Sequence, residues 1–184
     1  PEGKFSDWLY ENNVVGNEIG VFGPLGKATF HPEEKKNVLC MAGGSGIAGA
    51  CIVAKGIDPS IEVLAVQSEQ AQAGYLSWKK GEIVESEMNT VAEGIATRSG
   101  YELAQQIMAD LLDDFLLVSE DEIHQAIGTL VDKAHTLAEG AGATALAGAI
   151  RYPEKIKGKK VAITISGGNI TVDQLRESLK VYQK

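Results

Sequence analysis

The chain of 184 residues has the length of a single domain or of one large piece of a bigger enzyme, which excludes a multi-domain catalytic machine. Hydrophobic residues make up 44% of it and charged residues 23%, proportions that are typical of a globular fold and argue against disorder. Its 17 Lys and Arg against 25 Asp and Glu give a net charge of -8, so nucleic-acid binding, which requires a basic surface, is not expected.

Nothing in the sequence resembles a membrane anchor or a disulfide framework. No apolar run approaches the ~20 residues that cross a bilayer, and the first residues lack the order of a signal peptide, so we expect a cytoplasmic protein. Cys40 and Cys51 are too few for a framework and lack the CxxC spacing or neighbouring His that zinc requires. Both are expected to be reduced core residues.

Residues 1–36 have a different pattern from the rest of the chain. Glu18–Phe22 and Ala28–Phe30 look like short antiparallel strands around the turn 23–26. From residue 37 onward, strand-like and helix-like segments alternate. We therefore predict a β segment over residues 1–36 and an α/β domain over residues 37–184.

Four short runs within residues 37–184 are mainly apolar at successive positions. A strand with this pattern has two apolar faces, as strands buried on both faces of a sheet do. The runs span residues 37–42, 61–66, 115–118 and 160–165. Helices are predicted between and after them, over residues 47–55, 103–112, 123–134, 141–150 and 171–179. Two capping boxes, Ser99–Glu102 and Ser119–Glu122, mark predicted helix starts. The predicted inner stripes of these two helices are Leu103, Ala104, Ile107, Met108, Leu111 and Leu112, then Ile123, Ala126, Ile127, Leu130, Val131 and Ala134.

This alternation predicts the fold class: α/β, with a three-layer parallel sheet that has helices on both faces, preceded by the short β segment. Such sheets bind ligands at the carboxyl ends of their strands. Glycine runs at 43–46, 140–142 and 167–168 fall at predicted element ends. Glycine lets a backbone approach a phosphate or a flat ring closely, although each run alone is equally typical of a tight turn.

From residue 43 onward the sequence resembles the threonine and serine dehydratases, which are pyridoxal phosphate (PLP) enzymes of the tryptophan-synthase-β type. The matching stretches, in order over about 140 residues, are GGSGIAGACIVAKGIDPSIEVLAVQSE, TVAEGIATRSGYELAQQI, DDFLLVSEDEI, LAEGAGATALAGAI and GKKVAITISGGNIT. The resemblance implies a lyase that eliminates water and then ammonia from L-threonine or L-serine.

The same resemblance implies roles for particular residues. Gly43, Gly44, Ser45 and Gly46 would form the loop that binds the cofactor phosphate at a helix N-terminus. Ser166, followed by Gly167, would hydrogen-bond the pyridine nitrogen, and Glu139 would lie beside the ring. As alternatives, Ser166–Gly168 is an ordinary turn and Glu139 a solvated carboxylate at a helix end.

Two features of this family are missing. The Schiff-base lysine normally stands well before the phosphate loop in a Ser-Phe-Lys-like context, which is absent; Lys4 and Lys27 precede the loop without that context. The residue after the second predicted strand is Gln67 and not a carboxylate, so no metal site is expected. The dehydratase is therefore expected to be incomplete and inactive by itself.

The first 50 residues resemble a second family, the flavin reductases of the ferredoxin-reductase type. The resemblance rests on Gly3–Ser6, on GPLG at residues 23–26 and on NVLCMAGGSGIAG from residue 37. It implies FAD or NAD(P) as cofactors and overlaps the first resemblance at residues 43–49. We interpret the chain as a chimera joined at that loop.

The remaining candidate residues indicate no separate site. His124 and His135 are expected at the surface or its boundary, His31 in a solvated turn, and Trp8 and Trp78 in the core or at its edge.

Three functions stay open: a dehydratase-like PLP protein, a fragment of an NAD(P)H-dependent flavin reductase, and an inactive α/β scaffold whose loops bind a phosphate-bearing small molecule or nothing. Uncovered apolar edges also predict self-association, as a dimer.

Overall fold

The computed structural model describes residues 38–43 and 46–183, all within one compact unit, Pro32–Lys184. The β segment expected over residues 1–36, with Trp8 and His31, lies outside the described residues. Gly44 and Ser45 of the glycine loop lie outside them too.

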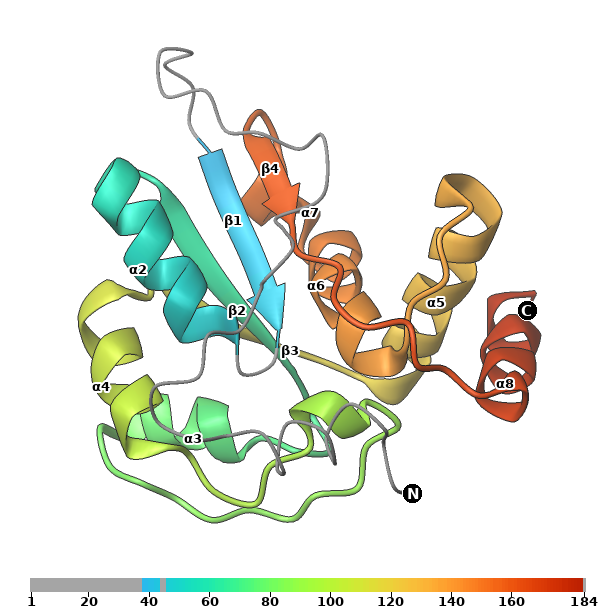
Figure 1. Ribbon diagram of the computed structural model, residues 1–184, viewed down its shortest axis with the longest axis horizontal. Helices are drawn as coiled ribbons and strands as arrows, with labels where there is room; N and C mark the ends of the chain where they lie inside the picture. Colours follow the sequence, from blue (N-terminus) through green and yellow to red (C-terminus); the bar gives the residue numbers. More distant parts are fainter. Residues whose placement is uncertain (1–37, 44–45, 184) are drawn as a thin grey trace, which may run out of the picture. The chain divides into compact units, whose positions relative to one another are not determined.

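A sheet of four parallel strands forms the centre of the fold (Figure 1). The strands β1 (Val38–Gly43), β2 (Glu62–Ser68), β3 (Asp114–Val118) and β4 (Lys160–Ile163) lie in the order β3-β2-β1-β4. The register pairs Gly43 with Val66 and Met41 with Ile163. The predicted parallel sheet is confirmed.

Helices cover both faces of this sheet, so the three-layer prediction is also confirmed (Figure 1). On one face lie α2 (Ile47–Ile57), α3 (Ala73–Lys80) and α4 (Glu102–Leu111). On the other face α6 (Gly140–Arg151) lies against the strands, with α5 (Glu120–Ala134) beside it and α8 (Val172–Tyr182) beside α5. The short η2 (Glu93–Ile95) and α7 (Pro153–Ile156) complete the described elements.

Alternate residues of β2 pack into two different clusters, which explains why this strand is apolar on both sides. Val63 and Ala65 pack with Cys51 under α2, whereas Leu64 and Val66 pack in the cluster under α5 and α6. Cys51 is fully buried, as predicted; the side chain of Cys40 lies outside the described part of the chain. Trp78 lies against Phe115, with ring centroids 6.0 Å apart, and is an edge-of-core aromatic as expected.

The two predicted capping boxes have different outcomes. The one at the start of α5 is confirmed: Ser119 accepts a hydrogen bond from the Glu122 N–H (3.3 Å), and Glu122 accepts one from the Ser119 N–H (2.7 Å). The box at Ser99 is wrong, because α4 begins at Glu102 with Tyr101 as its N-cap. Ser99 instead forms an antiparallel bridge with Glu85.

Three further expectations need correction. Leu103 is 71% exposed, since it lies five residues, about 140° around the helix, from the buried Met108. In the stripe of α5, Ile123, Ala126, Ile127 and Leu130 are buried, but Val131 is half-buried and Ala134 exposed. The last strand ends at Ile163, two residues earlier than predicted, because pairing with β1 stops there.

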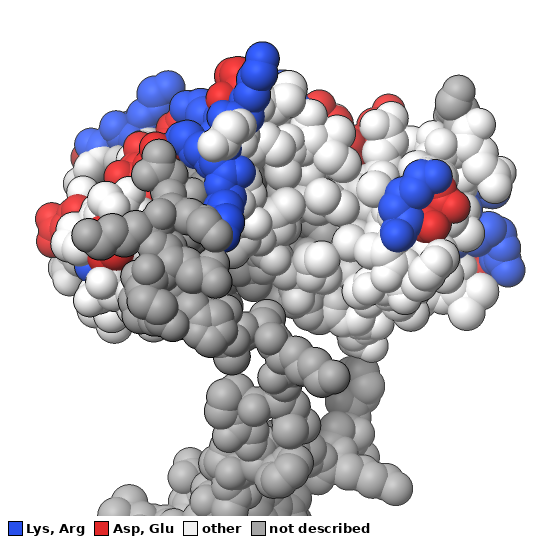
Figure 2. Space-filling view, turned by 90° about the horizontal axis from the view of Figure 1, so that it is seen from above, with Lys and Arg blue, Asp and Glu red and all other residues white. Residues whose placement is uncertain are grey.

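Ion pairs hold the amino-terminal edge of the sheet together, where Lys and Arg gather among carboxylates (Figure 2). The pairs are Lys55 with Asp113 at 2.6 Å, Lys155 with Asp114 at 2.5 Å and Lys159 with Glu62 at 2.7 Å. The hydrogen bond to Asp114 raises the pKa of Lys155. Among the described helices, none has the length and apolar character to cross a membrane.

Candidate functional site at the carboxyl edge

The carboxyl edge, where the four strands end, is the place where those predicted site residues lie that the structure describes. β1 ends at Gly43, and α2 begins at Ile47 with Gly46 as its N-cap. A β-carbon on Gly46 would meet nothing within 4 Å, so the start of α2 is open on that side. The first N–H groups of a helix have no partner within the helix, which makes such an open start suitable for an anion.

Glu139 stands at the same edge, at the start of α6. It is the N-cap residue of α6, and its N–H donates to the carbonyl oxygen of Gly167 at 3.2 Å. Its side chain does not cap the helix, so its carboxylate can contact other groups at the carboxyl edge. The first turn of α6 contains only Gly and Ala, so other segments can approach it closely.

The loop after β4, residues 164–171, packs directly on this first turn. A β-carbon on Gly142 would lie 1.7 Å from the carbonyl oxygen of Ser166. Gly167 has a φ of +62°, and a β-carbon there would lie 2.2 Å from Oε1 of Glu139. The two segments, 139–142 and 166–168, therefore fit together because both carry glycine at the contact.

A third segment, the loop between α3 and α4, completes the arrangement. A β-carbon on Gly94 would lie 2.9 Å from Cβ of Ala141 and 3.6 Å from Oε1 of Glu139. A β-carbon on Gly140 would lie 3.0 Å from Cα of Ala92. Gly94 was not predicted from the sequence, because a single glycine in a loop gives no signal of a close approach.

Two cavities open at this edge. The smaller, of about 50 Å³, is bordered by Glu93, Gly94, His124, Glu139, Asn169 and Gln174 among others. The larger, of about 290 Å³, is mainly apolar, and Ile47, Gln67, Gly94, Thr97, Gln105 and Phe115 are among the residues that line it. Gly94 borders both. Oε1 of Gln105, one of the lining residues of the larger cavity, is buried without a hydrogen-bond partner.

Of the predicted site residues, the structure brings Glu139 and Gly167 into contact and places Ser166 beside them. Gly43 and Gly46 lie at the same edge, because β1 is the neighbour of β4 and both strands end there. Ser166 itself is exposed. Gly44 and Ser45 fall outside the described residues.

The structure also places the histidines for which no separate site was predicted, and Gln67, for which no metal site was expected. His124 is half-buried, with Nδ1 2.9 Å from Oγ of Ser178, and borders the smaller cavity. His135 is exposed and ends α5 with a φ of +51°. Gln67 is buried and accepts a hydrogen bond from the Tyr75 N–H at 3.0 Å, so its amide serves the first turn of α3. Within residues 46–183, no three His, Cys, Asp or Glu side chains are grouped to hold a metal ion.

Comparisons with known proteins show the family and the fold of this chain. Residues 16–167 match the family described as pyridoxal-phosphate dependent enzyme. The L-threonine ammonia-lyase of Thermotoga maritima is 36% identical over 146 residues, which are 78% of this chain and 36% of that protein.

Two solved structures have the same fold. The processed form of threonine deaminase isoform 2 from Solanum lycopersicum superposes with a TM-score of 0.73 at 31% identity, over 81% of this chain and 45% of that one. Serine racemase from Dictyostelium discoideum gives a TM-score of 0.68 at 34% identity, over 76% of this chain and 46% of that one.

The chain spans less than half the length of each of these three relatives. The match to the family nevertheless covers most of this chain and includes the strands and helices that form the carboxyl edge. The chain belongs to the family of pyridoxal-phosphate dependent enzymes, with an α/β fold and pyridoxal phosphate as the family's cofactor.

Proposed function

We propose that this chain forms the cofactor-binding part of a lyase of the threonine and serine dehydratase type. Such a lyase removes water from a hydroxyamino acid and then releases ammonia by hydrolysis, which leaves a 2-oxo acid. The observation that carries the proposal is the contact of Glu139 and Gly142 with Ser166 and Gly167, made by two segments far apart in the sequence.

The residues present fit PLP. The open start of α2 at Gly46 suits its phosphate. The two cavities that meet at Gly94, one of which Glu139 borders, lie at the same edge of the sheet. When bound, PLP supplies the electron sink that the bond-breaking steps require.

The chain's own residues would bind the cofactor and orient it. Residues 43–46 would hold the phosphate through backbone N–H groups, which are favoured partners of an anion at a helix start. The Ser166 hydroxyl would hydrogen-bond the pyridine nitrogen, and Glu139 would stand at the side of the ring. The apolar wall of the larger cavity, which includes Ile47 and Phe115, would exclude water from the bound group.

We propose also that this chain alone does not supply the lysine that bonds to the cofactor. None of the described residues that line either cavity is a lysine. Lys55, Lys155 and Lys159 are engaged in ion pairs at the opposite, amino-terminal edge of the sheet. The expected result is cofactor binding without dehydratase turnover.

An absorbance titration with PLP, followed by borohydride reduction and peptide mapping, tests both parts of this proposal. Saturable binding that is abolished by excess inorganic phosphate, with no lysine labelled after reduction, is the expected result. The absence of saturable binding would overturn the cofactor role. A single labelled lysine, with 2-oxo acid formed from L-threonine or L-serine, would overturn the statement that this chain lacks its nucleophile.

The reductase-like resemblance of residues 1–50 receives no support from the comparisons, and the family match already includes residues 16–36. We therefore propose no oxidoreductase activity and no FAD or NAD(P) site. The interpretation as a chimera and the cytoplasmic location both stay predictions.

We propose that the chain self-associates through exposed apolar side chains of α2. Ile52 is 52% exposed and Val53 61% exposed, next to each other on the outer side of the helix. A second copy of this chain that covers them would bury apolar area at a favourable free energy.

A further inference from the structure

The loop Gly81–Tyr101, which joins α3 to α4, contains little regular structure. Within it the structure shows the short η2 and the bridge between Glu85 and Ser99. The middle of the loop is nevertheless buried in the protein: Thr90 and Val91 are half-buried, and Ala92 is fully buried. A long loop that is packed in this way needs contacts that hold it.

One carboxylate provides these contacts. Glu120, the first residue of α5, accepts hydrogen bonds from Thr90 Oγ1 at 2.8 Å and from the Val91 N–H at 2.7 Å. It also accepts one from Oγ of Ser68, the fully buried last residue of β2, at 2.5 Å. Both oxygens of Glu120 are used, and they tie the loop to the end of β2 and the start of α5.

The held residues lead directly to the cofactor site. Ala92 lies against Gly140, and two residues later Gly94 lies against Ala141 and Oε1 of Glu139. Because the loop is covalently continuous, the position of Val91 determines how closely Gly94 approaches Glu139. A shift of the loop would therefore change the wall that both cavities share at Gly94.

We infer that Glu120 is a positioning residue for the PLP site: it holds Thr90 and Val91 and thereby places Gly94 beside Glu139. The inference rests on the proposed cofactor role of this edge. Glu120 itself lines neither cavity, so it acts through the loop backbone and not by contact with the cofactor.

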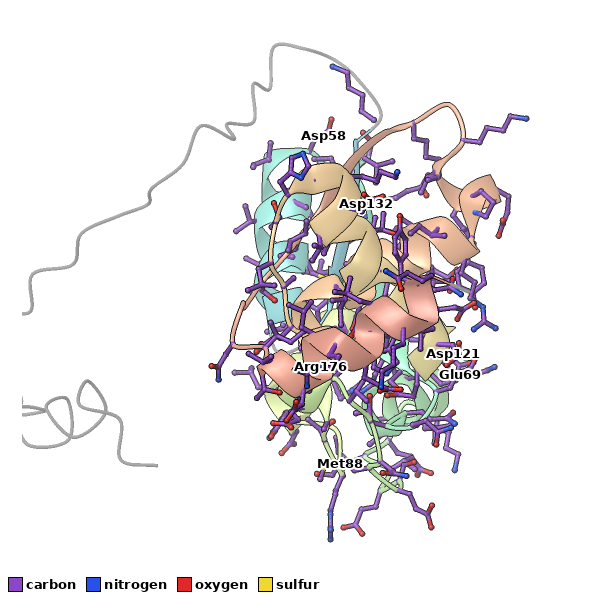
Figure 3. All side chains as sticks on the ribbon, turned by 90° about the vertical axis from the view of Figure 1, so that its right-hand side faces the viewer. Asp58, Glu69, Met88, Asp121, Asp132 and Arg176 are labelled. Carbon is purple, nitrogen blue, oxygen red and sulfur yellow. The ribbon has the colours of Figure 1, made fainter. Side chains whose placement is uncertain are left out.

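Helix stability is the alternative explanation for Glu120, because a carboxylate in a first turn also stabilises a helix. Glu122 offers a matched control. It stands in the same turn with the same charge, but its carboxylate accepts from the Ser119 N–H and from Arg151, at 2.7 and 2.8 Å. Figure 3 labels Asp121, which lies between these two glutamates at the start of α5, and Met88 on the loop.

The experiment compares Glu120→Gln with Glu122→Gln in the full chain. PLP affinity is measured by titration, and amide hydrogen exchange is measured in peptides that cover residues 86–97. In Glu120→Gln one carboxylate oxygen becomes an NH₂ group, which cannot accept from Val91 or Thr90. We expect its PLP Kd to rise about tenfold, which corresponds to ~1.4 kcal/mol, with faster exchange at Val91.

Glu122→Gln is expected to change the PLP Kd by less than about twofold and to leave exchange at residues 86–97 unchanged, since its contacts do not involve the loop. Thr90→Val serves as a milder variant should Glu120→Gln fail to fold. It removes the hydrogen bond of Thr90 to Glu120 and also the one that Thr90 Oγ1 accepts from the Ala92 N–H at 3.1 Å, and it leaves the bond of Val91 to Glu120 in place. It is expected to raise the Kd by a smaller factor than Glu120→Gln.

Equal effects of Glu120→Gln and Glu122→Gln on Kd would overturn the positioning role and leave only helix stability. Unchanged exchange at residues 86–97 in Glu120→Gln would also overturn the positioning role. Neither of these two results would affect the proposed binding of PLP by the unaltered chain. Failure of the unaltered chain to bind PLP would instead overturn the proposed function, and with it the cofactor part of this inference.

Discussion

The carbonyl oxygen of Ser166 lies 1.7 Å from the position that a β-carbon would take on Gly142. No side chain fits at Gly142 unless the loop after β4 moves away from α6. Since this loop carries Ser166 and Gly167, the absence of a side chain at Gly142 is what lets the loop reach Glu139. The contact explains the small residues in the first turn of α6 better than helix formation does, because glycine weakens a helix.

Gly142→Ala should therefore destabilise the fold, although alanine is the better helix former. We expect a loss of about 1–3 kcal/mol in the free energy of unfolding, measured by urea denaturation, from the overpacked contact with Ser166. Gly49→Ala in α2 is the control, since a β-carbon there meets nothing within 4 Å. The control should gain up to ~1 kcal/mol; a loss of the same size in both variants would contradict the packing argument.

Gly167→Ala should weaken PLP binding at least tenfold in the absorbance titration, because the new methyl group would displace the Glu139 side chain. The control is Gly158→Ala, whose φ of +77° carries a similar backbone cost, about 1–2 kcal/mol, without any neighbour within 4 Å. Both variants should lose stability, but Gly158→Ala should keep its PLP affinity. Parallel losses of affinity would show that backbone strain alone was responsible.

Ser119→Ala should cost about 1 kcal/mol of stability, because it removes the side-chain half of the capping box of α5. Ser99→Ala should cost clearly less, since Ser99 lies outside the N-cap position of α4. Urea denaturation of the two single variants is sufficient to compare them. A larger loss for Ser99 would mean that the capping box predicted from the sequence operates after all.

The hydroxyl of Tyr182 donates to Oδ2 of Asp132 at 2.8 Å, a contact that joins α8 to α5. This hydrogen bond raises the pKa of Tyr182 above 10.0, and hydrogen bonds from Lys133 and then Tyr182 lower the pKa of Asp132 below 3.8. The Tyr182 contribution to stability is thus present below pH 10.0 and is lost as the pH rises through its folded pKa. The Asp132 contribution is present above pH 3.8 and is lost as the pH falls through its folded pKa.

NMR titration of a ¹³C-labelled tyrosine ring measures the pKa of Tyr182 directly. Asp132→Asn is expected to bring this pKa down toward its ordinary value. Asp173→Asn, which removes a partner of Arg176 on α8, should leave the pKa where it is. An unchanged pKa in Asp132→Asn would rule out the hydrogen bond as the cause of the shift.

Light scattering at micromolar concentration should give the mass of a dimer for the unaltered chain. Val53→Lys should lower the measured mass toward that of one chain, because it places a charge on the exposed apolar side of α2. Val172→Lys on α8, where Val172 is 71% exposed, should not change it. A monomer for the unaltered chain would refute the proposed self-association.

The sequence by itself is sufficient to predict most of the elements. Runs such as residues 61–66 are apolar on both sides, which indicates a strand with a helix layer on each face, and β2 has that arrangement. Helix α3 is not predictable in this way, because Ala73 and Ser77 are its buried residues and form no apolar stripe. Its first turn is held by Gln67 instead, a contact with no signature in local sequence.

For the site, the glycine runs and the family resemblance are enough to indicate Glu139, Ser166 and Gly167. The sequence could not show that Gly94 meets Glu139, nor that Glu120 holds the loop leading to it, because these contacts join residues 29 or more positions apart. Local patterns record which residues suit a strand, a helix start or a turn. Only the packing of α6 against the loops from Gly81 and Thr164 decides which of them come within contact distance at the carboxyl edge.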